Sequence, residues 1–347
     1  MLTFSLALVM IVKNEARSIQ RCLDSISPFV DSMLVLDTGS TDNTVALARA
    51  CGARVEHFRW RNDFAAARNA ALAFSNADWN IILDADEWLS RGKESLQQLR
   101  QQKPDFVGSV EIVSSYVIAD CKQHGHSIIS RVLPKGVRYK GIIHEQPEHV
   151  LPVKPLQIQL GHDGYEPAQQ QAKKQRNLQL LQLALQHDPD DCYLHYKLGV
   201  ELELAGQSAA AIKYYEQASH VSSKAITWRL DLVIRLLFLY KKHKCFSEGL
   251  MLAEQESALR NLSADFDFAL GDFYLELAIH QPVQATVIIP KIEQCWLNCL
   301  KKGEVSGVNG AVAGRGSFLA AHNLAIFYQS LGKTDQSQHY FQLASDF

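Results

Sequence analysis

The sequence has 347 residues, with 35 Lys and Arg against 37 Asp and Glu, for a formal net charge of −2. At roughly 100 to 200 residues per domain, this length allows about two domains. The near-neutral charge argues against a nucleic-acid binder, because affinity for phosphate needs a basic surplus. Hydrophobic residues make up 47% and charged residues 21%, which is typical of a globular protein and excludes extended disorder.

No apolar stretch reaches the roughly 20 residues that a transmembrane helix needs, so at most a peripheral membrane contact is expected. The apolar segment from Leu2 to Val12 could be the centre of a secretory signal, but no Lys or Arg precedes it and no small-x-small cleavage site follows. The seven Cys are an odd number without a CxxC pair, which favours neither a disulfide framework nor a zinc site. We therefore expect a cytoplasmic protein.

Short apolar strands and helical segments alternate four times in the first ninety residues. Strands are predicted at residues 4–12, 32–36, 54–58 and 79–83. Apolar residues at helical spacing lie between them, and Asp63 is a candidate N-cap for one of the helices. This alternation predicts an α/β domain with a mostly parallel, doubly wound sheet.

Polar clusters follow three of these strands, namely Lys13-Asn14-Glu15, Asp37 to Asp42 and Asp84-Ala85-Asp86. In open parallel sheets the ligand crevice lies beyond the carboxyl ends of the strands, so these clusters are expected to face one crevice. From Asp105 to about Leu160 the pattern changes to short β runs separated by Gly and Pro. They predict a mixed or antiparallel extension that completes the sheet.

After Gly164 the sequence becomes rich in Gln, Leu and Ala, which predicts helices as far as the last residue. Two segments share one spacing of small and large residues, typical of tetratricopeptide helical hairpins: Leu198-Gly199, Leu202, Gly206, Ala211, Tyr215 and Ala218 match Leu324-Ala325, Tyr328, Gly332, Ser337, Phe341 and Ala344. We predict an α/β domain at residues 1–165 and a helical repeat domain at 166–347. The segment from His162 to Tyr165 is interpreted as the hinge between them.

The Asp84-x-Asp86 motif is the strongest chemical signal. Two carboxylates separated by one residue can present oxygens to a hard divalent cation, which keeps positions open for diphosphate oxygens. Such a pair is often only a solvated turn, but here an apolar strand leads directly into it. Asp37 ends its strand and is assigned to a ligand, whereas Asp42 is assigned to capping the next helix. Arg68 lies among Ala residues and is expected to reach inward.

Four motifs, in this order, resemble those of the family 2 nucleotide-sugar glycosyltransferases of the A-type fold. They are Met10 to Glu15, Leu36 to Thr44, Asp63 to Asn69 and Leu83 to Glu87. Arg131 and the segment from Tyr139 to Glu145 resemble the Gly-x-x-His-Glu element of a subgroup that includes lipopolysaccharide-core glucosyltransferases and peptide S-glycosyltransferases. In the peptide S-glycosyltransferases a tetratricopeptide-like domain also follows the catalytic domain.

This resemblance implies a Rossmann-like domain that binds a nucleotide-sugar donor such as a UDP-sugar. Asp37 and Arg68 would contact the nucleobase. The backbone of Val12, Asn14 and Glu15 would pack beside it.

The resemblance also implies a metal site next to the donor. Asp86 would be the main ligand of Mn²⁺ or Mg²⁺, Asp84 would face the ribose or the metal, and His144 would complete the site. Arg131 is expected to contact the diphosphate or the acceptor, with a solvated basic edge as the equal alternative. Trp88 has two interpretations, stacking on a sugar face or packing within the domain.

Family 2 members are expected to invert the anomeric carbon by direct displacement, which needs a base for the acceptor proton. Glu145 is the first choice, because it lies on a loop expected to close over the crevice, and Glu87 is the second. The leading hypothesis is a metal-dependent glycosyltransferase with a peptide, protein or glycolipid acceptor. The alternative is an inactive scaffold that binds a nucleotide sugar, or binds peptides through its helical repeats.

Overall fold

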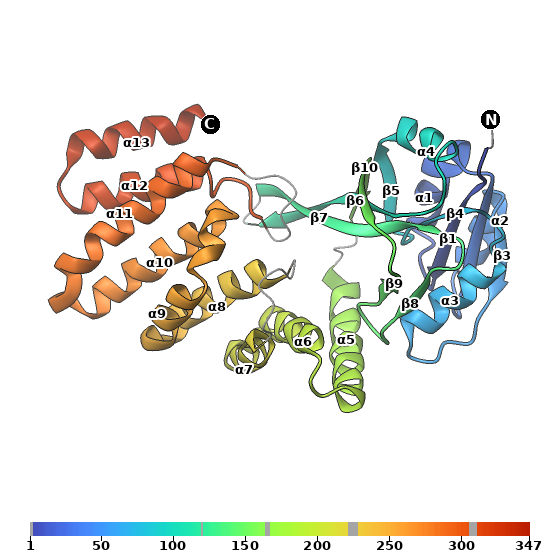
Figure 1. Cartoon of the computed structure of the whole chain (residues 1–347), viewed down its shortest axis with the longest axis horizontal. Helices are drawn as coiled ribbons and strands as arrows, with labels where there is room; N and C mark the ends of the chain where they lie inside the picture. Colours follow the sequence, from blue (N-terminus) through green and yellow to red (C-terminus); the bar gives the residue numbers. More distant parts are fainter. Residues whose placement is uncertain (1–2, 119–120, 164–166, 221–227, 305–310) are drawn as a thin grey trace. The chain divides into compact units, whose positions relative to one another are not determined.

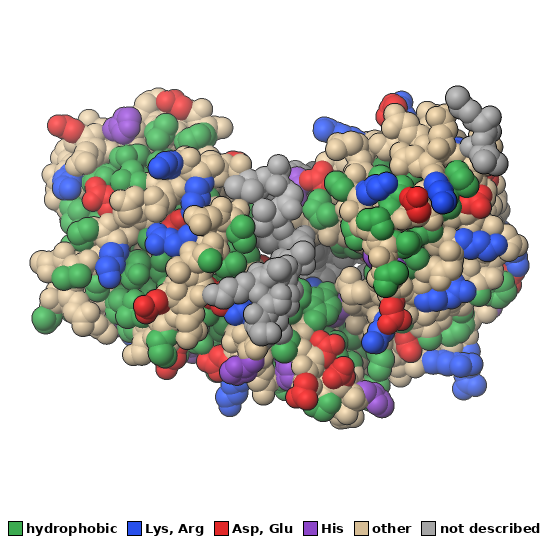
Figure 2. Space-filling model, viewed as in Figure 1, with side chains coloured by type: hydrophobic (Ala, Val, Ile, Leu, Met, Phe, Trp, Pro, Cys, Tyr) green, Lys and Arg blue, Asp and Glu red, His purple; other side chains and the backbone are tan. Residues whose placement is uncertain are grey.

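The computed structural model describes residues 3–118, 121–163, 167–220, 228–304 and 311–347. The chain divides into two compact units, Met1–Pro189 and Asp190–Phe347 (Figure 1). The first unit includes helix α5 (Pro167–His187), which follows the boundary expected from the sequence. Among the helices in the described ranges, none combines the length and apolar composition that crossing a bilayer requires. Side chains of both charge signs occur on the visible face of each unit (Figure 2).

The first unit is built on an eight-stranded sheet with the order β3-β2-β1-β4-β7-β6-β10-β5. Its first strands are parallel, because β1 pairs with β2 and β4, and β2 pairs with β3. This confirms the predicted parallel sheet. The four strands are β1 (Leu6–Val12), β2 (Ser32–Asp37), β3 (Arg54–His57) and β4 (Trp79–Ile82).

The predicted mixed extension is also confirmed. A long hairpin of β6 (Val107–Ile118) and β7 (Cys121–Pro134) joins the sheet where β7 pairs antiparallel with β4. Strand β10 (Val153–His162) then pairs parallel with β6. The short strands β8 (Arg138–Lys140) and β9 (Gln146–Glu148) form a separate antiparallel pair.

One strand and one helix of this unit were not predicted from the sequence. Strand β5 (Glu87–Arg91) begins directly after Asp86 and pairs antiparallel with β10. Helix α4 (Lys93–Leu99) follows it, after Gly92 at a φ of 96°. The strand is short and ends in polar residues, so it lacks the clear alternation of a predicted strand. Its presence makes Glu87 a strand residue opposite His162.

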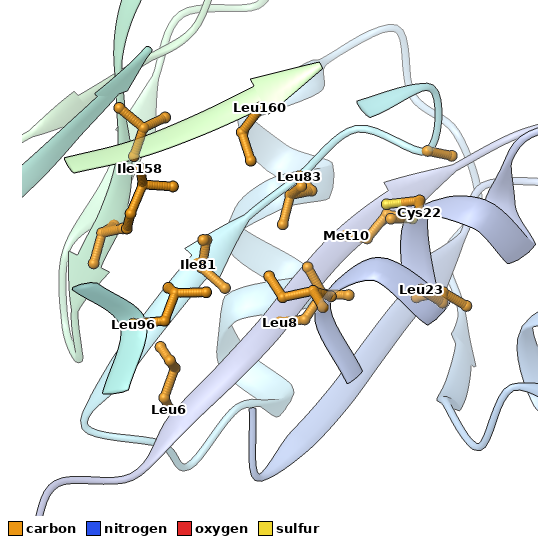
Figure 3. Packing of buried hydrophobic residues seen from close by; sticks show 14 of the residues in the cluster. Leu6, Leu8, Met10, Cys22, Leu23, Ile81, Leu83, Leu96, Ile158 and Leu160 are labelled. Carbon is orange, nitrogen blue, oxygen red and sulfur yellow. The ribbon is translucent and has the colours of Figure 1, made fainter. Parts of the chain in front are cut away.

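Both faces of the sheet are covered, and alternate residues of β1 supply the two cores. Leu6, Leu8 and Met10 face helices α1 (Ile19–Ile26) and α4 in a cluster that continues to Leu160 on β10 (Figure 3). On the other face, Ala7 and Val9 pack with helix α3 (Phe64–Phe74). The sheet is therefore held from both sides, and its carboxyl edge is left for polar loops.

Helices α1 and α3 form where the sequence predicts them. The apolar residues of α1 recur at helical spacing and are all buried: Ile19, Cys22, Leu23 and Ile26. Asp63 caps α3, because its carboxylate accepts from the backbone N–H of Ala66 at 2.8 Å. The cap fixes where α3 begins, and with it the position of Arg68 one turn later.

The second unit consists of helical hairpins, as the sequence predicts. They are α6 (Cys192–Leu204) with α7 (Ser208–Ser219), α8 (Arg229–His243) with α9 (Phe246–Gln255), α10 (Ala264–His280) with α11 (Ala285–Lys302), and α12 (Phe318–Ser330) with α13 (Thr334–Asp346). Gly206 and Gly332, matched by the sequence repeat, both lie between paired helices at positive φ, 77° and 70°. Tyr215 packs so closely on Gly199 that an added Cβ would lie 2.5 Å from its ring.

Candidate functional site

The loops that follow β1 and β2 are bonded to each other at the carboxyl edge of the sheet. The backbone N–H of Asn14 donates to Ser40 Oγ at 2.9 Å, and the Asn14 side-chain oxygen accepts from Thr41 N–H at 2.8 Å. The N–H of Glu15 donates to Thr44 Oγ1 at 2.8 Å. Asn14 has a left-handed backbone, with a φ of 54°. Two segments that are far apart in the sequence therefore form one surface.

Asp37 ends β2 at this surface and is almost completely buried, with 4% of its area exposed. Its carboxylate accepts from the backbone N–H groups of Gly39 and Ser40, both at 3.1 Å. His57 Nδ1 lies 3.4 Å from the same carboxylate. Asp42 accepts from the N–H of Thr44, the first residue of helix α2 (Thr44–Ala50), but the N-cap position of this helix is Asn43 and not Asp42. Asp37 is thus held rigidly beside the loop after β1.

Asp84 lies between two buried arginines that come from distant parts of the sequence. Its Oδ1 accepts from Arg68 Nη2 on α3, and its Oδ2 accepts from Arg131 Nη2 on β7, both at 2.8 Å. Burial alone raises the pKa of the Asp84 carboxyl, but the guanidinium groups of Arg131 and Arg68 hold that pKa well below its usual range. Asp84 is therefore ionised at neutral pH.

Glu87 is buried and bonds both Arg131 and the backbone of Asp84. One carboxylate oxygen accepts from Arg131 Nη2 at 2.7 Å, and the other accepts from the backbone N–H of Asp84 at 2.9 Å. Burial raises the pKa of Glu87 to about 7, with the negative charges of Asp84 and Asp86 acting in the same direction and Arg131 opposing them. The Glu87 side chain is 4% exposed, so it faces the protein rather than the crevice.

Arg68 also reaches Glu145, at 2.5 Å between Nε and the carboxylate. The loop that carries Glu145 is attached to α3, because the N–H of Phe64 donates to the carbonyl of Ile142 at 2.8 Å. Asn69 adds two bonds to the backbone of Tyr139, as donor at 2.9 Å and as acceptor at 2.8 Å. The structure thus brings the predicted base next to the predicted donor residues.

His144 precedes Glu145 in this loop and has a left-handed backbone, with a φ of 52°. Its assignment as a metal ligand stays a prediction. Trp88 lies under the guanidinium of Arg21, 4.0 Å from the ring centroid, and against Gly161, where an added Cβ would lie 2.3 Å from the indole. These contacts are those of a side chain packed within the domain, the second interpretation offered by the sequence.

Asp86 has a neighbour that sequence reasoning missed. His162 Nε2 lies 3.6 Å from Asp86 Oδ2, and His162 Nδ1 lies 3.0 Å from Ser114 Oγ. Burial lowers the pKa of His162, but its hydrogen bond to Asp86 and the negative charge there outweigh burial and raise it. The sequence interpretation of His162 as part of a hinge was incomplete: His162 is the last residue of β10, whereas Gly164 and Tyr165 lie outside the described residues.

The network is rich in negative charge. Three carboxylates, those of Asp84, Glu87 and Glu145, share the guanidinium groups of Arg68 and Arg131. The fourth, Asp86, lies next to His162, so a negative surplus remains even if His162 is protonated. Across the described part of the chain, no group of three or more His, Cys, Asp or Glu side chains is preformed around one point as a metal cage. Any cation here would therefore complete its coordination with water or with ligand oxygens.

The comparisons with known proteins agree with this geometry. Residues 7–147 match the family described as glycosyl transferase family 2. A TPR repeat-containing protein of Synechococcus elongatus is 32% identical over 255 residues, 68% of this chain and 62% of the relative. The SPbeta prophage-derived glycosyltransferase SunS of Bacillus subtilis is 27% identical over 298 residues, 76% of this chain and 70% of the relative.

Among solved structures, glucosyl-3-phosphoglycerate synthase from Mycobacterium tuberculosis in complex with Mn²⁺ and UDP-glucose is 27% identical over 31% of this chain and 44% of that chain, at a TM-score of 0.28. The chain spans less than two thirds of the cyanobacterial relative. The family match runs from β1 into β9 and includes Asp37, Arg68, Asp84 and Asp86. The chain therefore contains a segment, residues 7–147, that matches glycosyltransferase family 2, and helical repeats follow that segment.

Proposed function

We propose that this chain is a metal-dependent, inverting glycosyltransferase that uses a UDP-sugar donor. The observation that supports this most is the position of Asp84, held between Arg68 and Arg131 at the carboxyl edge of the sheet, with Asp86 two residues further on. Four carboxylates at this edge would repel a diphosphate. A donor diphosphate therefore needs a cation to bind here, which supports the metal dependence.

Asp86 and His162 fit a divalent cation. Two ligands that each lie about 2.1 Å from an ion are about 3.0 Å apart when adjacent and about 4.2 Å apart when opposite. The 3.6 Å between Asp86 Oδ2 and His162 Nε2 lies within that range. A bound Mn²⁺ or Mg²⁺ would offset the negative charge that develops on the departing diphosphate.

The remaining roles follow from the contacts of each side chain. Asp37 lies at the surface formed by the loops after β1 and β2, which supports its assignment to the nucleobase, with the backbone of Val12, Asn14 and Glu15 beside it. Arg68 bonds both Asp84 and Glu145, which supports a role in orienting carboxylates of the site as well as in donor binding. Arg131 plays the same part for Asp84 and Glu87, rather than forming a solvated basic edge.

Glu145 is a better base than Glu87. Both oxygens of Glu87 are already engaged, by Arg131 and by the backbone of Asp84. Among the described residues, Glu145 is bonded through one oxygen, to Arg68. In the reaction, Glu145 would take the proton of the acceptor hydroxyl or thiol. The acceptor atom would bond to the anomeric carbon as the bond from that carbon to the diphosphate oxygen breaks. The electron pair of the broken bond would leave with UDP.

The acceptor is proposed to be a peptide or protein, with a glycolipid as the alternative. Stacked helical hairpins of the kind in the second unit present extended surfaces that suit an elongated chain, which supports the peptide. A cytoplasmic location stays a prediction from the sequence.

Thermal unfolding with and without Mn²⁺ and UDP-sugars tests the proposal. We expect UDP-glucose or a related donor to stabilise the protein by about 2.7 kcal/mol at about 100 times its Kd, because a ligand that binds only the native state stabilises it. This stabilisation should require Mn²⁺, and it should disappear in Asp37→Ala and in Asp86→Ala. Asp105→Ala, which changes an exposed carboxylate, is the matched control and should behave as wild type.

Donor hydrolysis separates an enzyme from a scaffold. An active protein releases UDP in the presence of Mn²⁺, and chelation or Asp86→Ala stops the release. A protein that binds a nucleotide sugar but never turns it over, with or without candidate peptides, would support the inactive scaffold. Stabilisation by UDP-sugars that persists unchanged in Asp86→Ala with a chelator present would refute the metal site.

A further inference from the structure

His162 ends β10 and lies between strands β6 and β5. The residue opposite His162 on β6 is Ser114, and the residue opposite on β5 is Glu87. Ser114 Oγ lies 3.0 Å from His162 Nδ1, while the other ring nitrogen of His162 faces Asp86 Oδ2 at 3.6 Å. The imidazole is therefore held between a hydroxyl on one side and a carboxylate on the other.

We propose that Ser114 is a positioning residue for the donor site. Its hydroxyl oxygen accepts the Nδ1–H of His162, so that Nε2 is the nitrogen that faces Asp86 and would give up its proton to a divalent cation bound there. This inference rests on the proposed function, because it assigns a role to Ser114 in the metal site suggested there. Neutral histidine carries one N–H, and the group that accepts it decides which nitrogen is left as a ligand.

The position of Ser114 is fixed by contacts of Glu111, three residues earlier on β6. Glu111 on β6 accepts from Gln159 on β10 at 2.8 Å, and it bonds His126 on β7 at 2.8 Å. The β10–β6 register is irregular before Gln159 and regular from Gln159 to His162. The Glu111 contacts therefore lock the register of the segment in which Ser114 lies opposite His162, since a slip by one residue would turn both side chains to other faces.

The hydroxyl matters because the partner of a ligating histidine restricts its ring orientation and tautomer. Loss of such a partner typically weakens metal binding by about 10- to 100-fold. Ser114→Ala removes the acceptor without adding bulk, and Ser114→Thr keeps it. Ser109→Ala is the matched control: Ser109 lies on the same strand, is buried, and makes no side-chain hydrogen bond to another described residue.

The experiment measures Mn²⁺ affinity in the presence of UDP, by titration with the electron paramagnetic resonance signal of free Mn²⁺. We expect Ser114→Ala to weaken this affinity by about 10- to 100-fold, and Ser114→Thr and Ser109→Ala to stay close to wild type. Nitrogen-15 NMR of the metal-free protein gives a second readout. The Nδ1 resonance of His162 should show a hydrogen-bonded proton in wild type, and this hydrogen bond should be lost in Ser114→Ala.

Two outcomes distinguish the inference from the proposal beneath it. Wild-type Mn²⁺ affinity in a folded Ser114→Ala variant would overturn the role of Ser114 and leave the proposed function standing. A wild-type protein that binds neither Mn²⁺ nor UDP would overturn the proposed function itself. Loss of affinity in Ser114→Thr as severe as in Ser114→Ala would also refute the inference, because the hydroxyl is retained in the threonine variant.

Discussion

Buried charges are arranged in opposite ways in the two units. At the carboxyl edge of the sheet, carboxylates outnumber their cationic partners, and Arg68 Nη1 and Arg131 Nε have no hydrogen-bond partner among the described residues. In the helical unit, the fully buried Asp267 is bonded to two cations, Arg260 and Lys302. The carboxylate surplus of the first network leaves room for a further cation, and its two unsatisfied guanidinium N–H groups can donate to ligand oxygens. The Asp267 cluster is balanced by its own cations.

The same contrast holds for the glycines. In each unit an aromatic ring packs directly on a glycine, Trp88 on Gly161 in the first and Tyr215 on Gly199 in the second. Gly161 directly precedes His162 of the candidate site, whereas Gly199 lies inside a helical hairpin. A larger residue at either position would disturb packing, but only at Gly161 would it also disturb the candidate site. Matched substitutions at the two glycines can test this.

The largest expected effect is on the complete network of the helical unit. Asp267→Asn leaves Arg260 and Lys302 without their counter-charge and should destabilise the unit by about 3 kcal/mol, near the lower end for breaking a buried pair because both cations are partly exposed. Urea unfolding measures the loss. Asp272→Asn on the same helix, which breaks a more exposed pair with Lys241, should cost no more than about 1 kcal/mol. Equal losses would contradict the comparison.

Next in size are the two glycine substitutions. Gly161→Ala and Gly199→Ala should each destabilise by about 1–3 kcal/mol, because the added Cβ would lie 2.3 Å from Trp88 or 2.5 Å from Tyr215. Only Gly161→Ala should also weaken Mn²⁺ affinity, since it displaces the backbone next to His162. Thermal unfolding and the Mn²⁺ titration check the pair. If Gly199→Ala weakened Mn²⁺ binding equally, the weaker binding would come from lower overall stability and not from displacement of the backbone next to His162.

Removing a helix cap should have a smaller effect. Asp63→Ala and Ser263→Ala each remove the side-chain acceptor at the start of a helix, α3 and α10, and should cost about 1 kcal/mol. Donor binding should weaken a few-fold only in Asp63→Ala, because α3 carries Arg68. Donor affinity measured by thermal shift distinguishes the two variants. A loss of donor affinity in Ser263→Ala would contradict this expectation, because α10 carries no residue of the candidate site.

The smallest effect depends on pH. Hydrogen bonds from the backbone and hydroxyl of Ser5 lower the pKa of Asp78 below its ordinary value of 3.8. A group whose pKa is lower in the folded state stabilises the fold above its unfolded pKa, and the stabilisation is lost as the pH falls toward the folded value. Asp78→Asn should therefore cost about 0.5 kcal/mol at pH 7, because the side chain is only partly buried, and progressively less below pH 4. Unfolding free energies of wild type and Asp78→Asn, measured at pH 7 and below pH 4, check this. A difference between the two proteins that does not change with pH would contradict it.

Local patterns accounted for the elements whose residues alternate clearly. The strands β1 to β4, the hairpin region and the helical repeat were predicted, because buried strands and amphipathic helices need their own residue periods. Strand β5 was missed, since it is short and its pairing with β10 depends on a residue far along the chain. Helix α4 was missed because it has only 7 residues.

The sequence alone determined which polar groups end the strands, because a strand has to stop where polar residues begin and the carboxyl ends of parallel strands share one edge. It therefore identified Asp37, Asp84 and Asp86 as candidates. Only the tertiary structure decided their partners: Arg68, Arg131 and His162 reach the acidic motif from α3, β7 and β10. Such contacts depend on strand order and register, which long-range packing sets and no local spacing encodes.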